Sequence, residues 1–183
     1  AEKNNCTVLD RPNELCTDES VAEDVFVYNY NYFKNELNLN PEFLVILMCN
    51  AFGITSKTID KGIEILRNNE DLDSAVTVSR YNMFHPLRAR RVNSDGLLEP
   101  FVPFEHIGNP DKFNCNRDNQ GDVWFADMGV SIVRPRCIEN INEGILPQIW
   151  MGKNIYPLKQ TAALDIDYEY EVGQAKWWLE ENA

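Results

Sequence analysis

The sequence has little positive charge, and this shortage excludes one large class of partners. Its 183 residues carry 17 lysines and arginines against 29 aspartates and glutamates, which gives a net charge of −12. A protein that binds nucleic acid normally presents a basic face, and an acidic chain repels a long anionic backbone. We therefore expect no nucleic acid among its partners. A small nucleotide is still compatible with the sequence, because a few local cations and a metal ion outweigh the overall field at one site.

Long apolar segments and paired cysteines are also missing. The longest apolar run, Phe43 to Cys49, falls far short of the roughly 20 residues of a membrane span. The N-terminal residues are polar and lack the apolar core of a signal peptide. The five cysteines are odd in number, widely spaced and without a CxxC pair, which argues against a disulfide framework and a zinc site. These features predict a cytoplasmic protein without a membrane partner, in which Cys49 is a buried thiol.

Three familiar catalytic signatures do not occur in the chain. It contains no GxxxxGK[ST] phosphate loop, no GxGxxG turn and no serine nucleophile elbow. The proportions of apolar residues, 44%, and of charged residues, 25%, are those of an ordinary globular domain with a hydrophobic core. The chain therefore reads as one folded domain in which a complete nucleotide-binding site is not visible.

Hydrophobic periodicity predicts alternating helices and strands in the first half. Residues 18–39 have apolar side chains at helical spacing after Asp18, a candidate N-cap, and residues 56–68 repeat this pattern. The run from Phe43 to Cys49 is typical of a strand buried on both faces of a mostly parallel sheet, and residues 74–79 form a second strand. This alternation predicts an α/β fold with crossover helices.

The middle of the chain changes character. Residues 84–123 contain four prolines, three glycines and both histidines. Within them, the β-prone pieces Ala89–Val92 and Leu97–Val102 flank the turn sequence Asn93–Gly96, which predicts an antiparallel insertion. The remaining elements are expected to be a strand, a short helix, a short strand and a last helix, at residues 123–133, after Arg134-Pro135, at 155–158 and at 168–181.

Two carboxylates before the last helix form the sharpest candidate site. Asp165 and Asp167 are two residues apart, so in an extended segment they point the same way. Such a pair would bind a hard divalent cation, Mg²⁺ or Mn²⁺, that shares its coordination with substrate phosphates. The alternative is that one of them N-caps the last helix, because acidic residues commonly precede helices.

A basic segment within the acidic chain is the second candidate. His85 is followed by Arg88, Arg90 and Arg91, and arginine suits bidentate binding of a carboxylate or phosphate. The alternative is an exposed strand edge whose charges discourage pairing with another chain.

Two more groups are candidates for substrate binding. Cys49 and Asn50 follow the first strand, and open α/β sheets bind ligands at the carboxyl ends of their strands. Arg117 and Asp127, with the polar residues near them, would bind a polyol or an acid. The alternatives are an ordinary strand-to-helix turn and a polar loop.

Several segments resemble the acylneuraminate cytidylyltransferases, and they occur in that family's order over nearly the whole chain. The matching segments are Arg11–Asp18 (RPNELCTD, for RPxELAxD), the strand that leads into Cys49–Ala51 at the place of QPTSPLR, Asp73–Val78, His85–Arg88 at the place of the HP segment, and Leu164–Leu179 (for DIDxxxDxxxAE).

The resemblance implies a Rossmann-like three-layer nucleotidyltransferase fold, of the nucleotide-diphospho-sugar transferase type. It implies an enzyme that transfers CMP from CTP to a sialic acid-like sugar, releases pyrophosphate and depends on Mg²⁺. By position, Asp165 and Asp167 would be the catalytic metal ligands, and Arg88 would contact the sugar acid or phosphate. Residues 84–123 would build the sugar pocket and a homodimer interface. The other residues implied for substrate binding are His85, Arg117, Cys49, Asn50 and Asp127.

The chain also departs from this family. It has no counterpart of the glycine- and basic-rich loop that binds the triphosphate. Cys49 and Thr55 stand in place of the Gln and Arg of QPTSPLR. Phe125–Gly129 (FADMG) stands in place of YRxNG. We therefore expect these 183 residues to be inactive alone. We expect them to pair with a separate or cleaved N-terminal segment, or to dimerise extensively. A noncatalytic module that binds a nucleotide or a partner protein remains the alternative, and the sugar stays open.

Overall fold

The computed structural model describes residue 4 and residues 6–182, and their contacts divide the chain into two compact units. Unit 1 consists of residues 1–46, 56–76 and 131–156, and unit 2 of residues 47–55, 77–130 and 157–183. The helices are α1 (Ala22–Asn35), α2 (Ser56–Asn68), α3 (Pro135–Glu139) and α4 (Glu171–Asn182). The strands are β1 (Leu44–Leu47), β2 (Ser74–Arg80), β3 (Arg90–Val92), β4 (Leu98–Pro100), β5 (Trp124–Val133) and β6 (Ile155–Gln160).

The main sheet has the strand order β1-β5-β2-β6. Strand β2 lies inside it, and its side chains from Ser74 to Ser79 are all buried, as its β-branched, uncharged sequence predicts. Strands β2 and β5 are antiparallel neighbours. The amide of Arg134 donates a hydrogen bond to the carbonyl of Asp73 at one end, and the amide of Tyr81 donates one to the carbonyl of Val123 at the other. Between these two hydrogen bonds, β5 contains more residues than β2. Met128, within this part of β5, has φ +59°, and together these features indicate a β-bulge.

The alternation of helices and strands confirms the predicted α/β fold, with element boundaries that mostly differ by a few residues. The predicted hairpin is also confirmed, because β3 and β4 pair in antiparallel register with Val92 opposite Leu98. One helix start is wrong. The residue before α1 is Val21 and no side chain caps the helix, so Asp18 is not its N-cap.

The expectation that Phe43–Cys49 is buried on both faces is also wrong. Strand β1 stands at the edge of the sheet, and its alternate side chains Val45 and Leu47 are 40% and 49% exposed. Alternate residues of a strand share one face, so one face of β1 is open. Cys49, just beyond the strand, is exposed as well and is not the buried thiol we expected.

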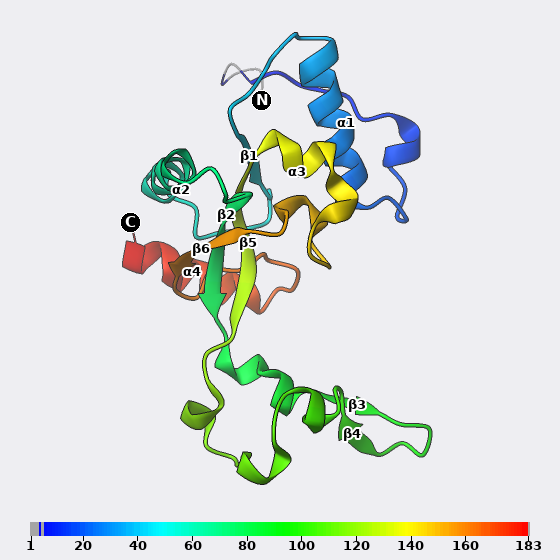
Figure 1. Cartoon of the computed structure of the whole chain (residues 1–183), viewed down its shortest axis with the longest axis vertical. Coiled ribbons are helices and arrows are strands. Elements are labelled where there is room, and N and C mark those ends of the chain that lie inside the picture. The colour runs from blue at the N-terminus through cyan, green and yellow to red at the C-terminus, as the bar shows by residue number, and fades with distance from the viewer. Residues whose placement is uncertain (1–3, 5, 183) are drawn as a thin grey trace. The chain divides into compact units, whose positions relative to one another are not determined.

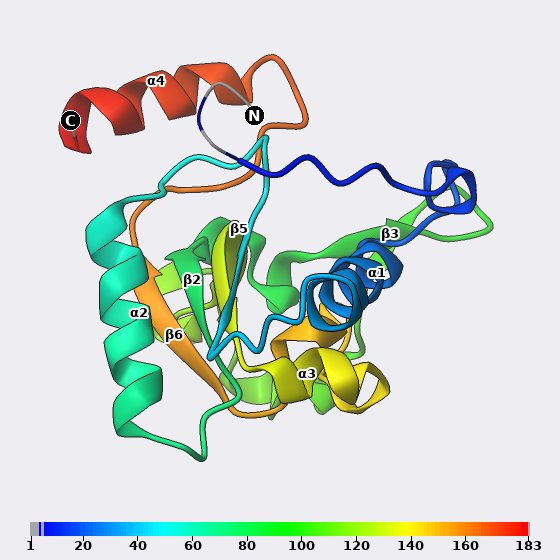
Figure 2. The ribbon, with the colours of Figure 1, turned by 90° about the horizontal axis from the view of Figure 1, so that it is seen from above.

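In unit 1, helices α1 and α3 lie side by side (Figures 1 and 2). The hydroxyl of Tyr30, the buried residue of α1, donates a 2.6 Å hydrogen bond to Glu139 of α3, and Lys34 donates another of 2.7 Å to the same carboxylate. Arg134 joins the end of α2 to the segment that follows it, since its guanidinium donates to the carbonyls of Leu66 and Leu72. Unit 1 is therefore held by charge-assisted hydrogen bonds as well as by packing.

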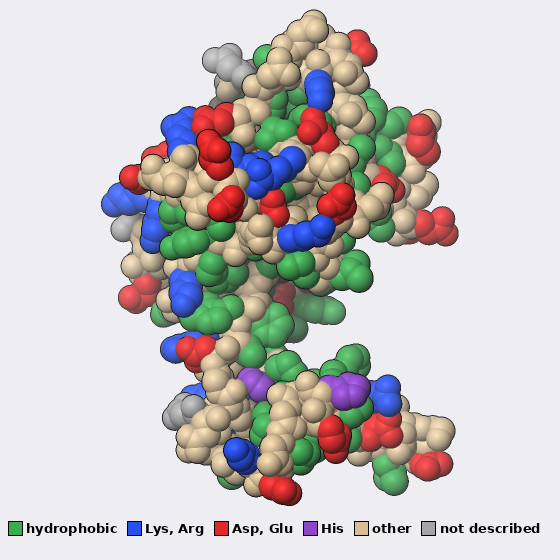
Figure 3. All heavy atoms as spheres, in the orientation of Figure 1, with side chains coloured by type: hydrophobic (Ala, Val, Ile, Leu, Met, Phe, Trp, Pro, Cys, Tyr) green, Lys and Arg blue, Asp and Glu red, His purple; other side chains and the backbone are tan. Residues whose placement is uncertain are grey.

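In unit 2, strands β2 and β5 lead into residues 81–123, which extend from their ends and carry the β3–β4 hairpin (Figure 1). Hydrophobic side chains lie on the surface of this segment beside both histidines (Figure 3), and those of Phe84, Leu98 and Phe101 are exposed. Helix α4 closes a small core elsewhere in unit 2. Its Trp178 packs against Phe52 with ring centroids 6.3 Å apart, whereas Val172 and Leu179 of the same helix are exposed.

Within the described residues, no helix combines the length and the apolar character that a membrane span requires.

We expect Gly53→Ala to destabilise the protein more than Gly96→Ala. Both glycines have a positive φ, +87° and +77°, but a Cβ at Gly53 would overlap the Cβ of Ala163, whereas one at Gly96 would enter open space. Backbone strain alone costs about 1 kcal/mol, and strain with overlap about 3 kcal/mol. Urea denaturation measures both losses. Equal losses would contradict the close packing of residue 53 on Ala163.

Candidate active site

The turn that follows β1 lies directly against the segment that precedes α4. The amide of Phe52 donates to the carbonyl of Leu164 at 3.2 Å, and the amide of Ile166 donates to the carbonyl of Asn50 at 2.9 Å. Between these bonds, Ala51 and Asp165 form an isolated antiparallel bridge. Two groups of residues that the sequence indicated separately, more than a hundred positions apart, therefore meet in unit 2.

The side chain of Asn50 contacts one of the two predicted carboxylates. Its Nδ2 donates to Oδ1 of Asp167 at 3.3 Å and approaches the carbonyl of Ile166 at 3.5 Å. Asn50 and Asp167 are exposed, and Asp165 is half-buried. The amide thus orients an exposed carboxylate without neutralising it, and leaves it available to a ligand.

The start of α4 settles the alternative role of the two aspartates. The helix begins at Glu171, four residues after Asp167, so neither aspartate adjoins it. Instead, Oε2 of Glu171 accepts hydrogen bonds from the amides of Asp167 and Tyr168, both at 2.8 Å. Glu171 satisfies the backbone of the turn, which frees both aspartate side chains from a capping role.

The donor set fits a cation that keeps part of its coordination for a substrate. Among the described residues, no group of three or more His, Cys, Asp and Glu side chains could hold a metal ion. An all-protein cage is therefore not formed there. Asp165 and Asp167 would supply two hard oxygen ligands, and Mg²⁺ characteristically binds one or two carboxylates together with phosphate oxygens and water.

Asp127 lies beneath this site in a buried hydrogen-bond network. Its side chain is 3% exposed. Oδ2 accepts from Oγ of Ser79 at 2.8 Å and from Nε2 of Gln160 at 2.9 Å, while Oδ1 accepts from the amide of Gly129 at 3.2 Å. A carboxylate with three such donors is satisfied by the protein itself, as a buried charge must be.

This network extends to the segment that carries the aspartates. The amide of Ala163 donates to Oγ of Ser79 at 3.1 Å, and the hydroxyl of Tyr81 donates to the carbonyl of Ala163 at 3.1 Å. Nε2 of Gln174, on α4, donates to the same hydroxyl at 2.8 Å. Burial raises the pKa of Tyr81, so its hydroxyl stays protonated at neutral pH. Ser79 and Tyr81 therefore fix residue 163, two positions before Asp165.

Sequence reasoning missed the residues of this network other than Asp127. A signal was present for Ser79, because it is a polar residue within the β-prone run 74–79, and a polar side chain buried in such a strand needs a partner. No local pattern marks Gln160 or Gln174, since their partners are distant in sequence.

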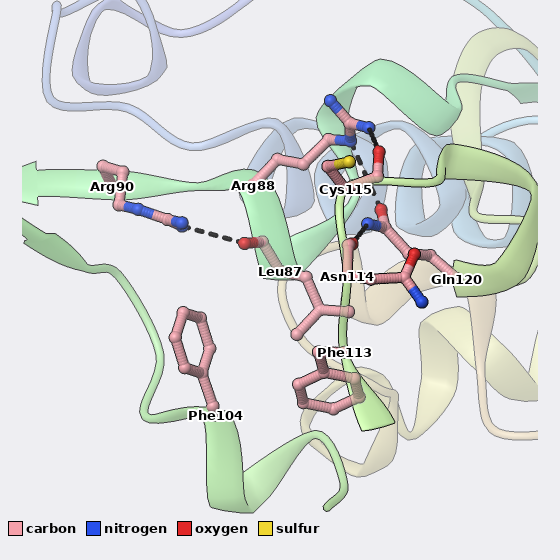
Figure 4. A pocket seen from close by; sticks show the side chains of 8 residues that line it. All are labelled: Leu87, Arg88, Arg90, Phe104, Phe113, Asn114, Cys115 and Gln120. Atoms are coloured by element: carbon pink, nitrogen blue, oxygen red, sulfur yellow. Dashed lines mark hydrogen bonds between the residues drawn. The ribbon is translucent and has the colours of Figure 1, made fainter. Parts of the chain in front are cut away.

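His85 and Arg88 lie in a different part of unit 2. His85 is 7% exposed, and its Nδ1 accepts from the amide of Leu87 at 3.1 Å, which caps the 3₁₀ helix η4 (Pro86–Arg88). Arg88 lines an open pocket of about 480 Å³, where it donates to Oε1 of Gln120 at 3.3 Å and to the carbonyl of Cys115 at 3.4 Å (Figure 4). His85 thus supports the turn, and Arg88 reaches the pocket.

The other two arginines of the basic segment have structural partners. Arg90 donates to the carbonyls of Leu87 and Ala89 at 2.8 and 2.9 Å and lies over the ring of Phe104. Arg91 pairs with Glu99 across the hairpin at 2.6 Å and is largely exposed. Arg91 therefore fits the alternative of a solvated strand edge.

Arg117 and Asp127, which the sequence grouped together, have different surroundings. Arg117 is exposed and lines another open pocket with Arg80 and Asp122, whereas Asp127 is buried in the strand network. The bulge in β5 explains the difference, because the added residue turns Asp127 inward toward Ser79.

No family model and no curated protein matches this chain. Among solved structures, it is similar to that of CMP:2-keto-3-deoxy-manno-octonic acid synthetase complexed with CTP, with a TM-score of 0.53 and 11% sequence identity. The similarity covers 91% of this chain and 70% of that one. It confirms the predicted fold class, a nucleotidyltransferase-like α/β fold.

We expect Ser79→Ala to lower the free energy of unfolding by about 2 kcal/mol, because it removes one hydrogen bond from the buried Asp127 and another from the amide of Ala163. Ser94→Ala, at an exposed hairpin position, should change it by less than about 0.5 kcal/mol. Chemical denaturation followed by circular dichroism compares them. Similar values for the two variants would show that the network does not stabilise unit 2.

Proposed function

We propose that this chain serves a nucleotidyltransferase that transfers CMP from CTP to an acidic sugar, a sialic acid-like nonulosonic acid or a relative, with release of pyrophosphate. The observation that carries the proposal is that the turn after β1 meets the segment of the two aspartates, with Ala51 opposite Asp165 and Asn50 donating to Asp167. The similarity in fold to a CTP-bound synthetase of a CMP-activated sugar acid supports the same reaction class.

In this proposal, Asp165 and Asp167 hold Mg²⁺ or Mn²⁺. Such an ion neutralises phosphate charge when a nucleotide is transferred. Asn50 is a positioning residue that keeps the carboxylate of Asp167 turned toward the shared site. The network of Ser79 and Tyr81 fixes the backbone before Asp165, so that the spacing between the carboxylates is set before any ligand binds.

The acidic sugar would be bound by residues outside the metal half-site. Arg88 reaches an open pocket and suits the carboxylate of the sugar. Cys49 is exposed next to Asn50, where it would contact a ligand of the metal half-site. His85 would support sugar binding indirectly, by capping the turn that contains Arg88. Asp127 would do so by holding together the strands that it joins. The exposed apolar side chains of residues 84–123 support a homodimer interface there.

A noncatalytic binding module is the second candidate, and a specific feature favours it. The 183 residues contain no glycine- and basic-rich loop for the triphosphate. Catalysis of phosphoryl or nucleotidyl transfer depends on groups that position and neutralise these phosphates. We therefore expect CTP binding without turnover from these residues alone.

The first test is calorimetric titration of the chain with CTP, with and without Mg²⁺. We expect binding that requires Mg²⁺ and that Asp167→Asn weakens at least about tenfold, because the amide is a poorer ligand for a hard cation. The matched control is Asp95→Asn, which removes the same charge from an exposed hairpin turn and should leave binding unchanged. Folding of each variant is checked by circular dichroism.

The second test separates the two candidates. Pyrophosphate release from CTP is measured with the protein and a panel of sugar acids, and again with UTP and GTP. Turnover with one acid and CTP supports the transferase. Mg²⁺-dependent CTP binding without turnover on any acid supports the binding module. If CTP neither binds nor turns over, both candidates are wrong.

A further inference from the structure

Positive charge gathers at one place in this acidic chain. Arg80, at the end of β2, pairs with Asp122 at 3.3 Å, just before β5. Arg117 lines the same open pocket of about 480 Å³ as these two residues. Lys159 of β6 is close enough for its charge to contribute to the lowered pKa of Asp122. Three cations of unit 2 therefore lie near Asp122, and Arg80 pairs with it, whereas the whole chain has a net charge of −12.

The surroundings hold this cluster in place. Nδ2 of Asn82 donates to Oδ1 of Asp122 at 2.8 Å, and Oδ1 of Asn82 accepts from the amide of Val123 at 3.1 Å. The hydrogen bond from Asn82, opposed by partial desolvation and reinforced by Arg80, holds the pKa of Asp122 below its ordinary value. The ammonium of Lys159 lies 4.6 Å from the centre of the Trp124 ring, a cation–π contact. These contacts reduce the entropy that long basic side chains lose when they bind a ligand.

One carboxylate does not neutralise the cluster. Arg80 has Asp122 as its partner, but none of the described carboxylate side chains forms an ion pair with Arg117 or Lys159. In a chain that repels anions overall, such an excess of cations produces a local positive field. Guanidinium groups bind carboxylate and phosphate oxygens by paired hydrogen bonds. The local charge therefore favours an oxyanion.

An apolar surface adjoins the cations. The ring of Tyr81 lines the pocket and contacts the rings of Phe84 and Phe125, with centroids 6.0 and 6.4 Å away. Met83 also lines the pocket and is 64% exposed, and Phe84 is 63% exposed. Large exposed apolar side chains beside fixed charges are typical of a surface that binds a ligand. A bare inorganic anion would use the cations but not these side chains.

We propose that Arg80, Arg117 and Lys159 form a binding site for a small oxyanion attached to a ring, in which the cations bind the phosphate or carboxylate and Tyr81 with Met83 contacts the ring. The site needs neither the metal nor the transfer of a nucleotide, so it stands or falls separately from the function proposed above. Asp122 organises Arg80 and also competes with the ligand for it.

Titration in EDTA at low ionic strength tests this site, because EDTA removes any metal that Asp165 and Asp167 would hold. The probes are CMP, N-acetylneuraminate, inorganic phosphate and uncharged cytidine, followed by amide chemical shifts. We expect saturable shifts near Arg80 and Arg117 with CMP, with N-acetylneuraminate or with both, weaker binding of phosphate, and none of cytidine. CMP alone identifies a phosphate-bearing ligand, and N-acetylneuraminate alone a sugar carboxylate.

Substitutions then assign the contacts. We expect Arg80→Gln and Arg117→Gln each to weaken binding at least about tenfold, since each removes a charge-assisted hydrogen bond. Arg91→Gln removes the same charge from the exposed hairpin and should leave binding unchanged. Asp122→Asn should strengthen binding several-fold, because it removes the competing negative charge and leaves Arg80 freer to bind the ligand.

Three results would overturn the proposal. They are the absence of saturable binding by every anion, shifts that lie elsewhere in the chain, and an equal loss of affinity in Arg91→Gln. Weaker binding in Asp122→Asn, with circular dichroism unchanged, would also contradict it, since a ligand held by the cations gains when their internal partner is neutralised.

Discussion

The hydrogen bond between Ser79 and the buried carboxylate of Asp127 is the contact on which the rest of unit 2 depends. Asp127 is 3% exposed, and Ser79, Gln160 and the amide of Gly129 all donate hydrogen bonds to its side chain, as a buried polar group requires. These donors come from β2, β6 and β5, so one carboxylate joins three strands. The bulge at Met128 is the local distortion that turns this side chain inward.

The candidate site is built outward from this network. Ser79 and Tyr81 fix residue 163, the segment then pairs with the turn after β1, and the carboxylate of Asp167 meets the amide of Asn50. The acids are thus placed by backbone hydrogen bonds rather than by other charges. A rigid segment with two exposed or half-exposed carboxylates suits a cation that a substrate shares, and this is the physical basis for the proposed transfer of CMP.

The sequence predicted the fold well because hydrophobic periodicity depends on local geometry. Leu66 of α2 and the residues of β2 are buried as their patterns indicated. The predicted burial was wrong at β1, where Val45 and Leu47 are exposed. A continuous apolar run occurs in edge strands as well as in central ones, so it does not distinguish the two. For the site, the motif that contains Asp165 was visible in sequence. The roles of Gln160 and Gln174 were not, because they depend on partners that only the fold brings near.

In the proposed function, Asp165 and Asp167 hold a divalent cation together with the phosphates of CTP. Paramagnetic broadening by Mn²⁺ tests it most directly, since it locates the ion without requiring turnover. With CTP present, substoichiometric Mn²⁺ should broaden the amide resonances of Asn50 and Ile166 before those of the other residues of unit 2. Broadening that is uniform, that centres on other acidic residues, or that is unchanged by CTP would contradict the account.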